Sequence, residues 1–256
     1  QTNLDYYKNE LVEEISKATN KKVTIETFDA SWNITNPRFI IKDFSIYADS
    51  SEKAFTFEKF EVDVSWMSLL KFELVLDQVT LYDLAVEIQK NSETDYLIGG
   101  WKVSYDPNSN DEFDGKLINW LLNQDEVQMI NAKIIWIDKT RANSPPLILD
   151  DINLSYSTSD ILSYLDRHLF YLDFLSSAGT KEKISLSGHF DADSIDELLE
   201  ADGVLSFKFD ALSLYAFSPW IDYPLTIKDG TGSLSINVEF ENGKLKEGGS
   251  SFSVKN

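Results

Sequence analysis

The chain has 256 residues, of which 43% are hydrophobic, and this combination allows a sizeable core and excludes intrinsic disorder. It carries 43 acidic against 23 basic residues, and the resulting net charge of −20 would repel the phosphate backbone of a nucleic acid. Cysteine is absent from the sequence, which excludes disulfides, thiolate metal sites and cysteine nucleophiles.

The first segment is predicted to be an amphipathic helix. Its apolar residues follow the 3.6-residue period of an α-helix. They are Leu4, Tyr7, Leu11, Val12, Ile15 and Ala18. We expect residues 1–22 to form a helical unit that caps the end of a β-domain of residues 23–256, with an ordinary surface helix as the alternative.

From Val23 onward the chain is predicted to be mainly β. Segments of roughly five to ten residues, rich in Phe, Tyr, Ile, Val and Leu, are separated by polar turn sequences such as Asn242-Gly243. Residues 160–175 fit either a helix or a strand. Short helices are expected at residues 117–123, at residues 194–200 and around residues 217–221.

An eight-residue pattern, apolar at positions 1, 3, 6 and 8, recurs along these strands. Its windows begin at Phe39, Phe55, Leu74, Val127, Leu147 and Phe207, and five of the six carry a carboxylate in the middle pair. If each window is one strand, an extra residue at its centre forms a β-bulge that keeps all four apolar positions on one face. Two strand stubs joined by a tight turn would also fit the pattern.

The bulge interpretation makes a specific prediction for residues 39–88. They should form successive antiparallel strands of one curved sheet, with the apolar side chains on its concave face. The bulges are expected at or beside Lys42-Asp43, Glu58-Lys59 and Asp77-Gln78.

Four groups of short stretches carry a family resemblance through nearly the whole chain. They are residues 22–26 with 30–32 and 36–44, residues 66–70 with 74–81, residues 119–122 with 132–138, and residues 217–221 with 230–234. In this order they resemble the AsmA-like proteins of Gram-negative envelopes, and most closely the N-terminal part of the YhdP branch. The most specific match is Phe217-Ser218-Pro219-Trp220-Ile221 followed by Gly230-Thr231-Gly232.

The resemblance implies a strongly twisted, curved antiparallel sheet that forms an open hydrophobic groove of the bridge-like lipid-transfer type. It implies a protein of the periplasm that carries phospholipid between the inner and outer membranes, with an inner-membrane anchor upstream of Gln1 and without a cofactor. Such a groove lowers the barrier to transfer, because an acyl chain in water costs about 0.8 kcal/mol per CH₂. The predicted groove residues are Ile41, Phe57, Val62, Leu76, Leu81, Ile134, Leu149 and Leu154.

Signs of catalysis or metal binding are weak in this sequence. The two histidines, His168 and His189, are far apart in sequence, and a calcium loop starting at Asp191 would need a glycine where Asp196 stands. The GxSxG motif of serine hydrolases is absent from the sequence. We therefore predict no catalytic or metal-binding residue. The alternatives are a closed β-sandwich used for protein interaction, and more remotely a glycosidase with two acidic residues.

Overall fold

The computed structural model describes residues 2–19, 21–33, 36–47, 53–65, 76–99, 101–104, 124–159, 167–192, 200–222 and 230–255. These residues form one N-terminal helix, one short 3₁₀ turn and a single 15-stranded sheet, which confirms the mainly β prediction. The predicted helix at residues 117–123 lies outside the described residues, as does the one at residues 194–200 except for Glu200. The elements are α1 (Thr2–Thr19), β1 (Val23–Thr24), β2 (Thr27–Asn33), β3 (Asn36–Tyr47), β4 (Lys53–Val64), β5 (Leu76–Tyr82), β6 (Ala85–Lys90), β7 (Asp95–Ile98), β8 (Trp101–Ser104), β9 (Glu126–Asp138), β10 (Leu147–Ser159), β11 (Arg167–Ser176), β12 (Ile184–Asp191), β13 (Asp202–Leu212), η2 (Tyr215–Phe217), β14 (Thr231–Glu241) and β15 (Lys244–Lys255).

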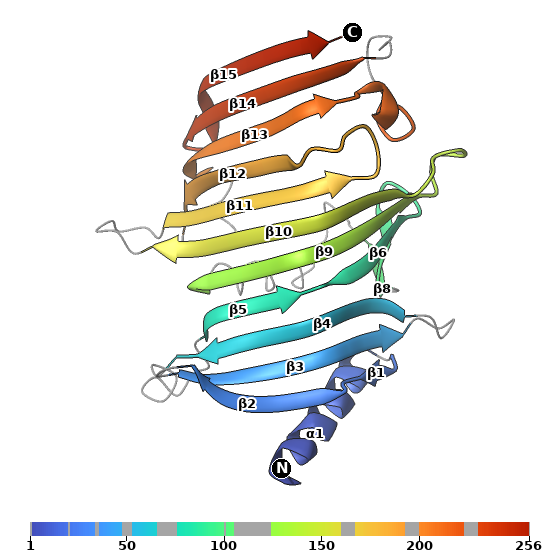
Figure 1. Cartoon of the computed structure of the whole chain (residues 1–256), viewed down its shortest axis with the longest axis vertical. Coiled ribbons are helices and arrows are strands. Elements are labelled where there is room, and N and C mark those ends of the chain that lie inside the picture. The colour runs from blue at the N-terminus through green and yellow to red at the C-terminus, as the bar shows by residue number, and fades with distance from the viewer. Residues whose placement is uncertain are drawn as a thin grey trace.

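The strands lie across the molecule and stack along its long axis, from α1 and β2 at one end to β15 at the other (Figure 1). From β9 to β15, each strand pairs antiparallel with the next strand of the chain. The ambiguous segment thus contains strand β11, and its residues 160–166 lie outside the described ones.

The sheet is mixed, so the prediction of a purely antiparallel sheet is wrong at one place. Strand β9 runs parallel to both β5 and β6. After β6 the chain forms β7 and β8. Strand β9 then lies beside β5 and β6 and runs in the same direction as both. A parallel pair needs such a crossover, whereas a tight turn can only join antiparallel strands.

Several long strands keep their apolar residues on one face by a local step in the backbone. We use the word step for a place in a strand where one residue, often in the left-handed conformation, is left out of the strand pairing. Asp43 has a φ of 52°, and the pairing skips it, because Lys42 pairs with Lys59 and Phe44 pairs with Phe57. Glu58 is skipped with it on β4. The apolar residues on both sides of the step belong to one cluster, which includes Ile41, Phe44, Ile46, Phe55 and Phe57.

The predicted extra residue that keeps the apolar positions on one face is therefore confirmed at Asp43 and Glu58, although its form differs from a bulge. Both strands leave out one residue at the same place, so the register is unchanged. At Asp77 the register does shift, since Gln78 pairs with Asp63 while Leu76 pairs with Val64. Strands β3, β4, β9 and β10 run through their windows, so the alternative of two stubs with a tight turn is wrong for them.

The steps continue from strand to strand. Asp83, Asn131 and Asp151 have φ values of 53°, 55° and 47°. Asn and Asp are the residues other than glycine that adopt this left-handed conformation most readily, because their short side chains can bond locally. This explains the polar residues at three of the window centres, namely Asp43, Asn131 and Asp151.

Hydrogen bonds join these steps into a polar ladder, which we define as Asp83, Asn131, Asp151, Asn153, Asp173 and Lys183. The Asn131 side-chain amide donates to Asp83, and the Asn131 backbone N–H donates to Asn153 Oδ1 at 3.1 Å. Asn153 Nδ2 donates to Asp173 Oδ1 at 3.1 Å. Lys183 Nζ closes the ladder at 2.7 Å from Asp173 Oδ1 and 2.9 Å from Asp151 Oδ2.

Helix α1 packs on the apolar face of the sheet at its N-terminal end. The three positions that make the contact lie on one side of the helix, as the sequence period predicted. The contacts join Leu11, Val12 and Ile15 to the buried cluster of Val23, Ile25, Phe44 and Ile46.

Replacing Asn131 tests whether the step itself stabilises the sheet. We expect Asn131→Ala to lower the free energy of unfolding by about 2 kcal/mol, because it loses a hydrogen bond and forces alanine into the left-handed region. Asn131→Gly loses only the hydrogen bond and should cost about 1 kcal/mol. Urea denaturation measures both, and equal losses would contradict the role of the backbone conformation.

Lys183 should give a stability difference confined to a pH window. The Lys183 ammonium holds the pKa of Asp151 below its ordinary value, and the hydrogen bond to Asp173 raises the pKa of Lys183 above its ordinary value. The stability from Asp151 is present above the ordinary carboxyl pKa and is lost as pH falls through its folded pKa. The stability from Lys183 is present below the ordinary lysine pKa and is lost as pH rises through its folded pKa.

We therefore expect Lys183→Gln to be less stable than the unchanged protein between about pH 4 and pH 10, with the difference shrinking outside that range. Lys208→Gln is the control, because Lys208 pairs with the exposed Asp210 on the protein surface. Denaturation curves at several pH values measure the difference. A difference that does not change with pH would count against this ion-pair account.

Candidate functional site

One line of apolar side chains crosses ten neighbouring strands. Each residue of this apolar row is the direct Cα partner of the next, and strand alternation puts them all on one face. The row consists of Phe28, Ile41, Phe60, Leu81, Met129, Leu154, Leu172, Leu186, Phe207 and Ile236, and it reaches Ser250 on β15. With strands about 4.8 Å apart, the ten apolar residues cover about 43 Å.

The ten apolar side chains of this row are all partly exposed. A row of this kind in the middle of a two-layer core would be buried by the opposite layer. All described strands belong to one sheet, so no second described sheet covers this face. The row itself therefore keeps part of its apolar surface in contact with solvent, although flanking residues of the same face such as Val79 and Ile152 are buried.

The neighbouring line of residues, one position along each strand, faces the other way and is mostly polar. We call this the polar row. It consists of Asp29, Ile40, Glu61, Thr80, Gln128, Ser155, Tyr171, Ser187, Ser206, Asn237 and Gly249. The sheet thus has an apolar face and a polar face, and the steps described above keep the two separate on both halves of the long strands.

The eight predicted groove residues all lie on the apolar face. Ile41, Leu81 and Leu154 belong to the apolar row itself. The others lie in flanking positions on the same face, where Ile134 pairs directly with Leu149. Seven of the eight are partly exposed, whereas Leu76 is 9% exposed and belongs to the core.

The predicted groove residues end at Leu154, although the sequence windows include one that begins at Phe207, so most of the C-terminal half of the face was not assigned to the groove. The signal was present as simple alternation in β14, where every second residue from Leu234 to Phe240 is apolar. The eight-residue windows overlooked it because β12 and β14 run straight through without a step.

Two segments cover parts of the apolar face. Helix α1 covers its N-terminal end. Near the other end, Leu214 and Phe217 of the segment around η2 pack against Ile184, Phe209 and Leu212. At the C-terminal edge the face is open, where Leu245, Phe252 and Val254 are 67%, 58% and 57% exposed.

The contacts of His168 are those of a structural histidine. Its ring is buried, with Nε2 at 2.5 Å from the Ala192 carbonyl oxygen and Nδ1 at 2.7 Å from the Tyr156 hydroxyl. The carbonyl can only accept, so Nε2 carries a hydrogen and donates it to the Ala192 carbonyl oxygen. Both ring nitrogens are therefore used within the fold.

Several charged groups of the described residues form ion pairs. Arg167 donates two hydrogen bonds to Asp191, both 2.8 Å long, and thereby lowers the pKa of Asp191. Arg141 binds Asp222 in the same two-point manner at 3.1 and 2.6 Å. Among the described residues, no group of three or more histidine, aspartate or glutamate side chains is placed to hold a metal ion. The described part of the chain also contains no helix with the length and apolar character needed to cross a membrane.

The model of the YhdP family, described as "YhdP protein", matches residues 1–256. A comparison with curated proteins found no match.

Proposed function

The chain belongs to the YhdP family, whose membership implies an AsmA-like lipid-transport protein, and from that premise we propose that its apolar face is an open groove for phospholipid tails. In this proposal the tails lie along the apolar row while the head groups stay in water. The protein would act without catalysis as a conduit between the inner and outer membranes. The polar face would be turned to the aqueous periplasm.

The observation that carries the proposal is the unbroken, partly exposed apolar row. Large exposed apolar surfaces are uncommon on soluble proteins and mark places where something apolar binds. A tail that moves along the row leaves one apolar contact as it gains the next. Each methylene that stays out of water saves about 0.8 kcal/mol, so a continuous row lowers the barrier to movement along the molecule.

The proposal assigns roles to both parts of the chain. Residues 1–22 would cap the groove, since α1 already packs on the apolar face at its N-terminal end. Residues 23–256 would form one groove domain. As the family resemblance implies, an inner-membrane anchor upstream of Gln1 would place this capped end beside the inner membrane.

The closed β-sandwich is the weaker explanation of the same residues. A sandwich needs two sheets packed face to face, about 10 Å apart. The described strands form a single sheet. The sealed core of an adhesin-like domain would bury this apolar row, whereas its ten side chains are all partly exposed.

Photo-crosslinking tests the groove directly. A photoreactive amino acid at Ile41, Leu81, Ile134 or Leu154 should capture phospholipid, because these side chains lie on the apolar face. The same residue at Glu61 or Lys133, on the polar face, should capture little. Mass spectrometry of the crosslinked protein measures both, and equal capture on the two faces, or capture on neither, would refute the groove.

Two adjacent residues of β10 separate transport from folding. Leu154 lies in the apolar row and Ser155 in the polar row, and Leu154 is partly exposed. We expect Leu154→Asp to melt only slightly lower but to block lipid transport, because a charge in the path raises the barrier for a passing tail by several kcal/mol. Ser155→Asp should change neither property.

The measurements are thermal melting of the purified protein and lipid transport in cells that depend on it. Collapse of the fold in Leu154→Asp would show that Leu154 lies in a sealed core, since an unpaired buried carboxylate is strongly destabilising. Normal melting with normal transport would show that lipid does not pass over Leu154.

A further inference from the structure

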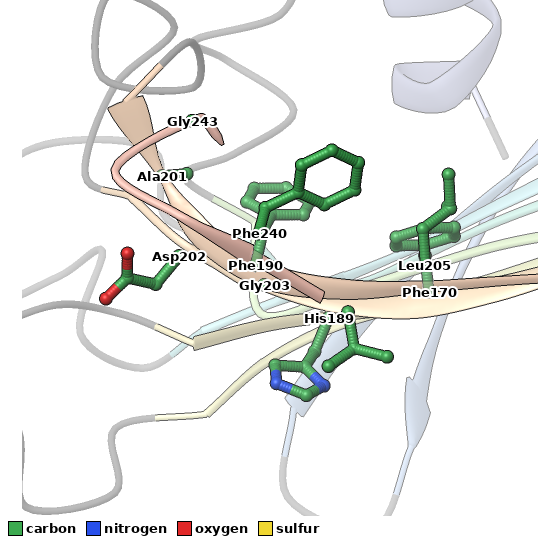
Figure 2. A pocket seen from close by; sticks show the side chains of 10 residues that line it. Phe170, His189, Phe190, Ala201, Asp202, Gly203, Leu205, Phe240 and Gly243 are labelled. Carbon is green, nitrogen blue, oxygen red and sulfur yellow. The ribbon is translucent and has the colours of Figure 1, made fainter. Parts of the chain in front are cut away.

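The hairpin of β2 and β3 presents exposed aromatic side chains at the N-terminal end of the sheet. Trp32 is 64% exposed and Phe39 is 38% exposed. Strand β2 pairs with β3 without a step, so every second residue from Phe28 to Trp32 points to the face that carries the apolar row. The same alternation is visible in Figure 2 near the other end of the sheet, where the adjacent residues His189 and Phe190 project from opposite sides.

Exposure on this face falls along β3 with distance from the hairpin. Phe39 and Ile41 are at least partly exposed, whereas Phe44 and Ile46 at the far end of the strand are 6% and 4% exposed. Helix α1 packs on that buried end, where residues such as Leu11 contact the cluster. The helix therefore covers one half of the N-terminal end, and the half beside the hairpin keeps its exposed aromatic surface.

Two phenylalanines join the hairpin to the apolar row. The rings of Phe28 and Phe39 stack with their centroids 6.1 Å apart and their planes 8° apart. Phe28 is the first residue of the row and pairs with Ile41, which pairs with Phe60. An acyl chain that arrives at Trp32 would therefore reach the row by moving over these stacked rings.

The apolar face of the hairpin is uncharged. Its residues before the step are Phe28, Ala30, Trp32, Pro37, Phe39 and Ile41. The charged neighbours Asp29 and Arg38 lie on the polar face, where Arg38 donates two hydrogen bonds to Asp63. A chain with a net charge of −20 is repelled by other anionic surfaces, so an uncharged face meets the least repulsion when it approaches a phospholipid bilayer.

The first turns of α1 lie at the same end of the molecule. Figure 1 shows the N-terminus of this helix projecting beyond β2. Tyr6 and Tyr7 in these turns are both exposed, and their rings meet edge to face at 5.7 Å. Tryptophan and tyrosine gather at membrane–water interfaces, because each combines an apolar ring with a polar group. This end of the molecule thus carries three exposed side chains of the two types that are typical of a bilayer interface.

We propose that the β2–β3 hairpin is the mouth of the groove, where Trp32 enters the head-group layer of a phospholipid bilayer and lipid tails pass over Phe39 and Phe28. The occupant of this surface is the bilayer, because an uncharged surface of amphipathic aromatic side chains suits the head-group layer. The inference rests on the proposed groove function and adds to it the place where lipid enters or leaves. Helix α1 would confine this exchange to the hairpin side of the sheet.

Site-specific fluorescence tests the contact with the bilayer. The chain has no cysteine, so Ala30→Cys, Ser31→Cys and Tyr215→Cys can each be labelled at one place. Ala30 lies on the apolar face beside Trp32, Ser31 lies on the polar face, and both are exposed. Tyr215, in η2 near the other end of the sheet, is an exposed control.

The labelled whole chains are mixed with phosphatidylcholine vesicles that contain phosphatidylcholine spin-labelled near its head group. The spin label quenches a fluorophore that enters the head-group layer. We expect strong quenching of the label at position 30 and little quenching at positions 31 and 215.

Substitution of Trp32 tests the mouth through a rate. We expect Trp32→Ser to slow the capture of phospholipid from vesicles by a photoreactive amino acid at Leu154 about tenfold, which corresponds to about 1.4 kcal/mol, and to leave the final amount unchanged. Trp32→Tyr should keep most of the rate, because tyrosine also suits the interface. Tyr215→Ser removes an exposed aromatic side chain elsewhere and should leave the rate unchanged.

The outcomes separate the mouth from the groove. Quenching at position 30 that is no stronger than at positions 31 and 215 would overturn the mouth. Capture at Leu154 that is equally fast in Trp32→Ser and in the unchanged protein would overturn the mouth while the groove stands. Absence of capture at Leu154 in every variant would overturn the proposed function and the mouth together.

Discussion

A long β-strand alternates its side chains between two faces, and this protein depends on a way of resetting that alternation. A left-handed residue in the middle of a strand shifts the parity by one position, so apolar residues on both sides of the step stay on the same face. Without the steps at Asp43, Asn131 and Asp151, half of each of the strands β3, β9 and β10 would turn its apolar residues toward the polar face. The two-faced sheet, and every use of its apolar surface, follows from this local conformation.

The polar ladder connects the steps of neighbouring strands and keeps them in line. Asn131 joins Asp83 to Asn153, and Lys183 joins the last two carboxylates, so a step on one strand is tied to the step on the next. Aligned steps leave the apolar row straight across the sheet. A misaligned step would put a polar side chain into the row, where a lipid tail would meet it as a barrier.

The sequence predicts the local pattern better than the arrangement of the strands. Carboxylates at the centres of the windows indicated the steps, because Asp and Asn tolerate left-handed backbone, and the prediction of one apolar face is confirmed. The parallel pairing of β9 with β5 and β6 was not predictable, since it depends on contacts far apart in sequence.

The central claim is that the apolar face is open to lipid in the folded protein. Extraction of the purified protein with organic solvent, followed by quantitative mass spectrometry, tests this claim most directly when it is combined with native mass spectrometry of the intact complex. The account predicts at least one phospholipid bound per folded chain, released when the chain unfolds. A folded chain that carries no phospholipid, even after incubation with vesicles, would contradict it.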